Sequence, residues 1–251
     1  EIKENMHKEL TGNETGLRAY YKMSNGTGTS LTDNSSNSNT GTLTNMDNSD
    51  WVSSQAPIGD LGSSYKTDVE GTWSVSGTSE SDASNGLTMT VGSALTAGNF
   101  TVFGNNNTSN ATTADLGSVA STIRTARIWQ VDESGTVAAT IKIDISDATG
   151  LSNGTGTASN YRLLYRSGTS GAFSSAATGS SISGDVVTFN SVSLQDGYYA
   201  LGAESDATLP VELTSFELLE TRNNGITLQW ITESEINNLG FNLDRKTPVT
   251  D

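Results

Sequence analysis

The sequence contains no cysteine and only one histidine among its 251 residues. Without cysteine the chain has no disulfide framework, no thiolate nucleophile and no zinc site of the Cys/His type. His7 is the only imidazole, and we expect it on a short helix that docks on a sheet, so a Ser-His-Asp triad is a weak hypothesis. No glycine-rich phosphate loop precedes a helix. We therefore predict that the protein is not an enzyme.

Basic residues are scarce as well. Lys and Arg number 13 against 28 Asp and Glu, which gives a net charge of -15, and Lys66 is the only basic residue between Lys22 and Arg124. Phosphate backbones and anionic membranes are bound by clustered Lys and Arg, so neither nucleic acid nor a membrane surface is an expected partner. No hydrophobic run has the length of a transmembrane helix, and we expect no direct membrane insertion.

Glycine, serine, threonine and asparagine fill much of the chain, and only 33% of the residues are hydrophobic. Low hydrophobicity combined with high net charge also fits disorder. Alternating segments argue for a folded chain instead, and the clearest one lies within 124–145, where two strands flank a polar turn at 132–135. The second strand has apolar residues at alternate positions, which places them on one face: Val137, Ala139, Ile141, Ile143 and Ile145.

Further strands are predicted by short apolar runs between turn signals. Within 65–203 they cover 72–75, 87–91, 99–103, 124–131, 137–145, 161–166, 186–189 and 198–202. Strands are also predicted at 16–23, 42–44, 51–53, 211–219, 225–230 and 240–245. The one helix predicted is Glu1 to Leu10, where Ile2, Met6 and Leu10 share a face. The sequence thus predicts an all-β protein of tandem antiparallel β-sandwich modules, jelly-roll or Ig-like, with one short N-terminal helix.

The first part of the chain resembles a known family. The segments 1–6, 10–14, 16–21 and 31–43 are similar to the C-terminal end of a laminin-G-like, concanavalin A-type jelly roll found in very large surface proteins of Bacteroidota. The upstream part of such a jelly roll is missing, so we expect the sequence to be a segment of a longer protein. The resemblance implies a calcium ion in the loop that carries Asp33, with oxygen ligands from Asp33, Asn34, Ser36 and Asn39. The alternative is a solvated turn in which these side chains cap their own backbone.

Two further resemblances divide the rest of the chain. The segments 102–106, 127–131 and 197–202 are similar to a poorly characterised β-sandwich module of the same surface proteins. The segments 209–216, 228–230 and 238–241 resemble the opening of a fibronectin type III-like or immunoglobulin-like module, which in those proteins precedes a type IX secretion sorting domain. We therefore predict three regions: 1–57, the end of the jelly roll; 58–205, the central sandwich; and 206–251, the start of the last module.

Two functions remain open at this point. One is an extracellular structural or adhesive segment at the cell surface, whose partners are other copies of itself or neighbouring modules, with assembly through β-strand edges. The other is a carbohydrate-binding accessory module of a secreted polysaccharide-degrading enzyme, with polysaccharide as the partner. The sugar would stack on exposed aromatic rings, for which the candidates are Trp51, Trp73, Tyr21 and Tyr199, with Tyr20 and Tyr198 beside them.

Overall fold

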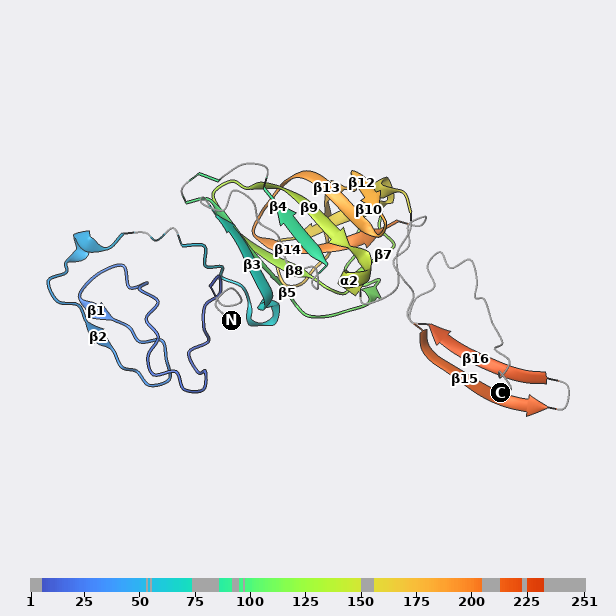
Figure 1. Cartoon of the computed structure of the whole chain (residues 1–251), viewed down its shortest axis with the longest axis horizontal. Coiled ribbons are helices and arrows are strands. Elements are labelled where there is room, and N and C mark those ends of the chain that lie inside the picture. Colours follow the sequence, from blue (N-terminus) through green and yellow to red (C-terminus); the bar gives the residue numbers. More distant parts are fainter. Residues whose placement is uncertain are drawn as a thin grey trace, which may run out of the picture.

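The computed structural model describes residues 6–52, 54, 56–73, 86–91, 95–96, 98–149, 156–204, 213–222 and 225–232. Within these residues the chain is almost entirely β-structure, and every pairing between its named strands is antiparallel (Figure 1). The all-β fold class is confirmed.

The larger of two packed sheets has eight strands. They are β3 (Thr67–Trp73), β5 (Phe100–Asn105), β6 (Ala111–Thr112), β7 (Ile123–Thr125), β8 (Trp129–Ser134), β10 (Tyr161–Arg166), β11 (Ser174–Thr178) and β14 (Gly197–Ala203). Six of them lie side by side in the order β11-β10-β14-β8-β5-β3, while β7 pairs with β14 and with β6. Most neighbours in this sheet are distant in the sequence, which a local pattern does not reveal.

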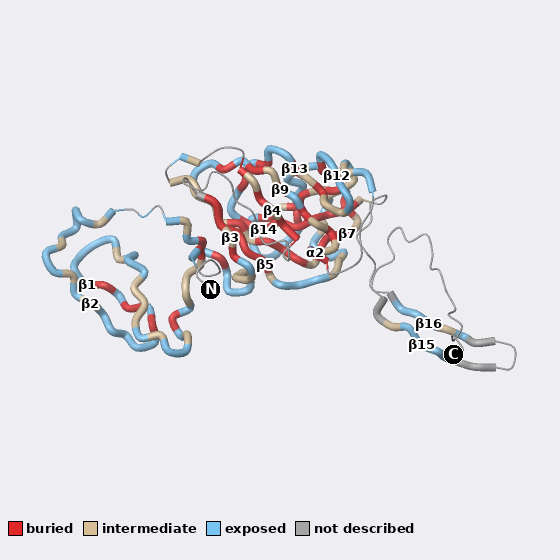
Figure 2. Tube along the Cα trace, viewed as in Figure 1, coloured by how far each residue is buried: buried red, intermediate tan, exposed pale blue. Residues whose placement is uncertain are grey.

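The smaller sheet has the order β12-β13-β9-β4. Its strands are β4 (Leu87–Thr90), β9 (Ala138–Asp144), β12 (Ser181–Ser183) and β13 (Val186–Ser193). The predicted alternation on β9 is confirmed, because Ala139, Ile141 and Ile143 are at most 2% exposed. These residues pack against Trp129 and Leu163 of the larger sheet in one core between the two layers (Figure 2).

The predicted strand at 124–131 is divided in the structure. Its first residues belong to β7 and its last to β8. The chain then turns at Gly135, which has φ +82 and abuts the Asn99 side chain, and it enters the other sheet as β9. Strands β8 and β9 therefore do not pair with each other, since β8 pairs with β5 and β14 while β9 pairs with β13 and β4. After β9 a single helical turn, α2 (Ile145–Thr149), replaces the predicted end of the strand.

Residues on the outer face of the larger sheet are also buried, although the outer face of a sheet in a β-sandwich is usually exposed to solvent. All seven residues of β14 are buried. A second apolar cluster, in which Phe173 packs with Leu164 and Tyr198, covers this face with help from residues of the 116–119 segment. The prediction that Tyr199 is an exposed ring is therefore wrong, and Tyr198 beside it is buried as well, because each face of the strand has its own core.

Two buried arginines of the larger sheet contact the second apolar cluster through Phe173. The guanidinium carbon of Arg124 lies 4.9 Å from the ring centre of Phe173, and that of Arg166 lies 4.4 Å away. Asp115 accepts from Arg124 at 3.4 Å and from Arg166 at 3.1 Å. Burial lowers the pKa of Arg124, an effect that the carboxylate of Asp115 opposes. The phenyl ring thus contacts two cations that share one carboxylate.

The N-terminal helix prediction is wrong for the residues that can be assessed. Residues 1–5 lie outside the described part of the chain, and Met6 and His7 form a turn rather than a helix. Lys8 forms a parallel bridge with Gly59, and the amide of Gly59 donates to His7 O at 3.0 Å. Pairing with the 57–60 segment satisfies backbone groups that a helix of this length would have left exposed.

The remaining N-terminal segment contains little regular structure. It holds β1 (Ser30–Leu31), β2 (Gly41–Thr42) and the short 3-10 helix η1 (Asn48–Asp50). The predicted strand at 16–23 is irregular, as are the described residues 51 and 52 of the predicted strand at 51–53. Two further 3-10 turns, η2 (Ser63–Tyr65) and η4 (Ala158–Asn160), precede β3 and β10.

The last described element is a hairpin of β15 (Leu213–Arg222) and β16 (Gly225–Thr232). Both strands were predicted. The two strands pair with each other along their length and form their own two-stranded sheet (Figure 1). The third strand predicted in this region, at 240–245, lies outside the described residues.

Candidate functional site

The loop that carries Asp33 is organised by the aspartate itself. Its Oδ1 accepts from the amides of Tyr20 and Ser35, both at 2.8 Å, and its Oδ2 accepts from the amide of Asn39 at 2.6 Å. The Ser35 hydroxyl adds a further bond to Oδ2 at 2.8 Å. Burial alone would raise the pKa of Asp33, but the amides of Tyr20, Ser35 and Asn39 outweigh it and lower this pKa to about 2. Asp33 therefore holds three chain segments together as an anion.

The other predicted calcium ligands take part in the same network through different groups. The Asn34 amide donates to Tyr20 O at 2.7 Å, and the Ser36 amide donates to Gly12 O at 2.9 Å. The Asn39 side-chain amide donates to Arg18 O at 2.8 Å. In the described residues no three acidic or histidine side chains are grouped as a metal site would require. Calcium binding here stays a prediction, and it would have to compete with four donors already on Asp33.

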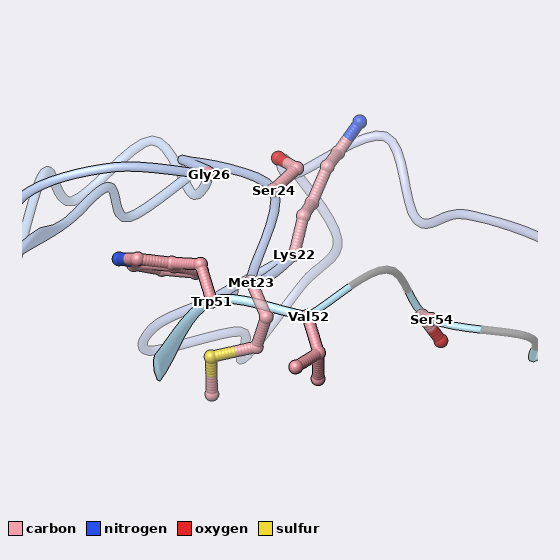
Figure 3. Close-up of a pocket in the computed structure, with 7 residues that line it drawn as sticks. All are labelled: Lys22, Met23, Ser24, Gly26, Trp51, Val52 and Ser54. Atoms are coloured by element: carbon pink, nitrogen blue, oxygen red, sulfur yellow. The ribbon is translucent and has the colours of Figure 1, made fainter. Parts of the chain in front are cut away.

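One hollow lies beside Trp51, one of the predicted sugar-stacking residues. It has a volume of about 390 Å³ and is lined by Lys22, Met23, Ser24, Gly26, Trp51, Val52 and Ser54 (Figure 3). Two of these are strongly exposed apolar side chains, Met23 at 61% and Val52 at 84%. The indole N–H of Trp51 donates to Gly28 O at 3.0 Å, which fixes the plane of the ring. The structure thus brings together two segments about 30 residues apart in the sequence.

The other candidate aromatics have different surroundings. Tyr21 is partly exposed and its hydroxyl donates to Asn39 O, so it belongs to the Asp33 loop. Trp73 ends β3 opposite Phe100, and its side chain lies outside the described part of the structure. Tyr199 is 3% exposed, and burial raises its pKa to about 12. A ring in that position has no free face on which a sugar could stack.

A second hollow of about 180 Å³ gathers carboxylates that the sequence does not place together. Asp60, Asp132 and Asp196 line it beside Tyr198. Burial raises the pKa of Asp132, and the carboxylates of Asp196 and Asp60 raise it further, while the amide of Asp60 donates to its Oδ2 and opposes this shift. The three aspartates come from a loop, from β8 and from the turn before β14, so only the pairing of distant strands reveals the cluster.

The β15–β16 hairpin carries an apolar face that the sequence analysis did not identify. Directly paired residues lie on the same side of a hairpin, and Phe216 pairs with Trp230 while Leu218 pairs with Leu228. We call these four residues the hairpin apolar face. Phe216 is 52% exposed, Leu218 59% and Trp230 38%. The opposite side is mixed, because Glu217 pairs with Gln229 there while Ile231, which is 54% exposed, pairs with Ser215.

His7 is buried, with 3% of its surface exposed, and its Nδ1 lies 2.8 Å from Pro57 O. Its ring also lies against Gly71 of β3, where an added Cβ would approach Nδ1 to 3.0 Å. The imidazole therefore packs between the N-terminal segment and the sheet. Among the residues that the structure describes, no helix is both long and apolar enough to cross a bilayer.

The fold defines an antiparallel β-sandwich with an extra covering layer and a separate hairpin. The chain belongs to the family described as Domain of unknown function (DUF8202), whose model matches residues 62–198. The match covers most of the sandwich and lies within the 58–205 region predicted from the sequence. No curated protein and no solved structure matches the chain.

Proposed function

We propose that the chain is a non-enzymatic structural segment of an extracellular cell-surface protein, and that copies of it associate through the β15–β16 hairpin. The observation that carries this proposal is the hairpin apolar face. A two-stranded hairpin is at best marginally stable in water, and a contiguous group of exposed large apolar side chains is typical of an interaction surface. The resemblance to surface proteins of Bacteroidota supports the location and the structural role.

A second copy is the occupant that the chemistry favours. Because the chain has a net charge of -15, two copies repel each other electrostatically, and association is favoured only where a surface carries no charge. The hairpin apolar face carries no charged residue, and Glu217 lies on the other side of the sheet. Two such faces meeting about a two-fold axis bury Phe216 and Trp230 from both copies and leave both Glu217 side chains in water.

The hairpin also offers a way to continue the association. Among the described residues, neither β15 nor β16 has a second partner strand, so one edge of each strand is unpaired. Unpaired edges accept further strands through backbone hydrogen bonds. Face-to-face contact combined with edge pairing would extend a dimer into a fibre, as expected for an adhesive or matrix component.

Light scattering of the purified chain tests the proposal. We expect a mass that rises with protein concentration for the natural sequence, and a monomer for the double variant Phe216→Lys, Leu218→Lys. The matched control is Glu217→Lys, which changes charge on the opposite side of the same strand and should leave association intact. A natural chain that stays monomeric at every concentration, or equal loss of association in the control, would contradict the proposed role of this face.

A further inference from the structure

The hollow beside Trp51 is held in shape before any ligand binds. Trp51 directly follows η1, whose capping residue Asp47 accepts from the Ser49 amide at 2.7 Å, while the Asp47 amide donates to Asp50 Oδ2 at 2.8 Å. The Gly28 amide donates to Asn48 Oδ1 at 2.7 Å, and Gly28 O accepts the indole N–H. Hydrogen bonds therefore hold both η1, which precedes Trp51, and Gly28, which accepts from its indole. Binding of a ligand need not order the Trp51 ring.

Met23 lies in an unfavourable backbone conformation at this site. Its φ is +55, in the left-handed region, which for a residue with a Cβ costs about 1–2 kcal/mol. The same residue exposes 61% of its surface. In Figure 3 its thioether projects beside Trp51 and Val52. Strained residues of this kind gather at ligand sites, where the surrounding structure maintains them.

The lining chemistry indicates what the hollow binds. None of its seven lining residues is acidic, although the chain holds 28 Asp and Glu. Its one cation, Lys22, is paired with Glu9 at 2.6 Å, so the hollow has little net charge. An aromatic ring and two aliphatic side chains lie beside the hydroxyl groups of Ser24 and Ser54. This combination suits a neutral ligand with an apolar face and a hydroxyl rim.

We propose that this hollow binds a neutral hexopyranose unit of a polysaccharide. The C–H face of the sugar stacks on Trp51 and contacts Met23 and Val52, and its hydroxyls reach the serine side chains. A volume of about 390 Å³ falls in the range of about 300–1,000 Å³ found for small-molecule sites. Anionic sugars and nucleotides are disfavoured, because the only cation of the site is already neutralised and the chain is strongly negative. The site is separate from the hairpin and does not depend on self-association.

The test is calorimetric titration of the whole chain with three neutral probes: cellohexaose, laminarihexaose and mannohexaose. We expect at least one to bind, with affinity reduced about tenfold or more by Trp51→Ala. The variant Val52→Asp should abolish binding and leave folding intact, because Val52 is 84% exposed. The matched control is Ile58→Ala, which removes an exposed apolar side chain outside both the hollow and the hairpin apolar face and should bind as the natural chain does.

Each outcome decides the proposal. Binding that is lost in Val52→Asp and retained in Ile58→Ala supports it. Failure of all three probes overturns it, and so does binding that persists in both Trp51→Ala and Val52→Asp. Light scattering on the same samples separates this result from the proposed self-association, because neither hollow variant alters the hairpin apolar face.

Discussion

Replacing Phe173 tests whether the outer face of the larger sheet is a true second core. Phe173 is 3% exposed and packs with Leu164 and Tyr198, and its ring contacts the guanidinium groups of Arg124 and Arg166. The variant Phe173→Ala removes the ring, leaves a cavity and takes the aromatic contact away from both cations. The variant Phe173→Leu keeps most of the apolar contact but has no aromatic face.

The expected losses of unfolding free energy differ between the two variants. Truncation of a buried phenylalanine costs about 3–5 kcal/mol. A desolvated cation–π contact contributes up to about 2 kcal/mol and an exposed one about 0.5–1 kcal/mol. With two contacts at 4.4 Å and 4.9 Å, we expect about 4 kcal/mol or more for Phe173→Ala. For Phe173→Leu we expect about 1–2 kcal/mol, since only the aromatic contribution is lost.

Urea unfolding at pH 7 measures both losses, with the fluorescence of buried Trp129 as the signal. A loss below about 1 kcal/mol for Phe173→Ala would show that the covering segment is not a core. Equal stability of Phe173→Leu and the natural chain would show that the arginines gain nothing from the ring. Either result would refute the account of this layer.

Three further predictions concern single residues. The folded pKa of Asp33, about 2, lies below the usual unfolded value of about 3.9. The stabilisation that ionised Asp33 provides is therefore present above about pH 3.9 and is lost as the pH falls towards 2. Hydrogen exchange of the loop amides should accelerate over this range, and Asp33→Asn should remove the pH dependence. An added Cβ at Gly86, where φ is +72, meets Ala148 N at 2.5 Å, so Gly86→Ala should lower the free energy of unfolding by about 2 kcal/mol or more. The control Gly184→Ala, where φ is +62 and the added Cβ enters open space, should lower it by only about 1 kcal/mol in the same urea assay. The pKa of Asp132 is raised by burial and by neighbouring carboxylates, so its ionised form opposes folding as the pH rises; Asp132→Asn should therefore raise the urea midpoint at pH 7 and change it little at pH 4.

Strands with strong apolar character could be predicted from the sequence. The bounds of β10 were predicted as they occur, and the alternation in β9 identified its buried residues. Strands β11 and β12 were missed because their serine, alanine and threonine residues lie at sheet edges and are mostly exposed. The partition of β8 and β9 between two sheets depends on long-range pairing, which a polar turn does not reveal.

The candidate sites divide in the same way. Asp33 was singled out through the resemblance to laminin-G-like jelly rolls, but only the structure shows that its carboxylate accepts the backbone amides of Tyr20 and Asn39. Trp51 could be named as an aromatic candidate, whereas the contribution of Met23 to the same hollow required the fold. The prediction that Tyr199 is exposed is wrong because a second layer covers β14, and no local sequence pattern indicates that layer.

The most direct test of the central claim places a single nitroxide label on the side of the hairpin opposite the hairpin apolar face. The chain has no cysteine, so Glu217→Cys gives one label per molecule, and any dipolar signal between labels must join two copies. We predict a clear signal from this position and a weaker one from Ser170→Cys, an exposed position in the turn before β11. No dipolar signal from position 217 at concentrations up to the solubility limit would contradict association through the hairpin.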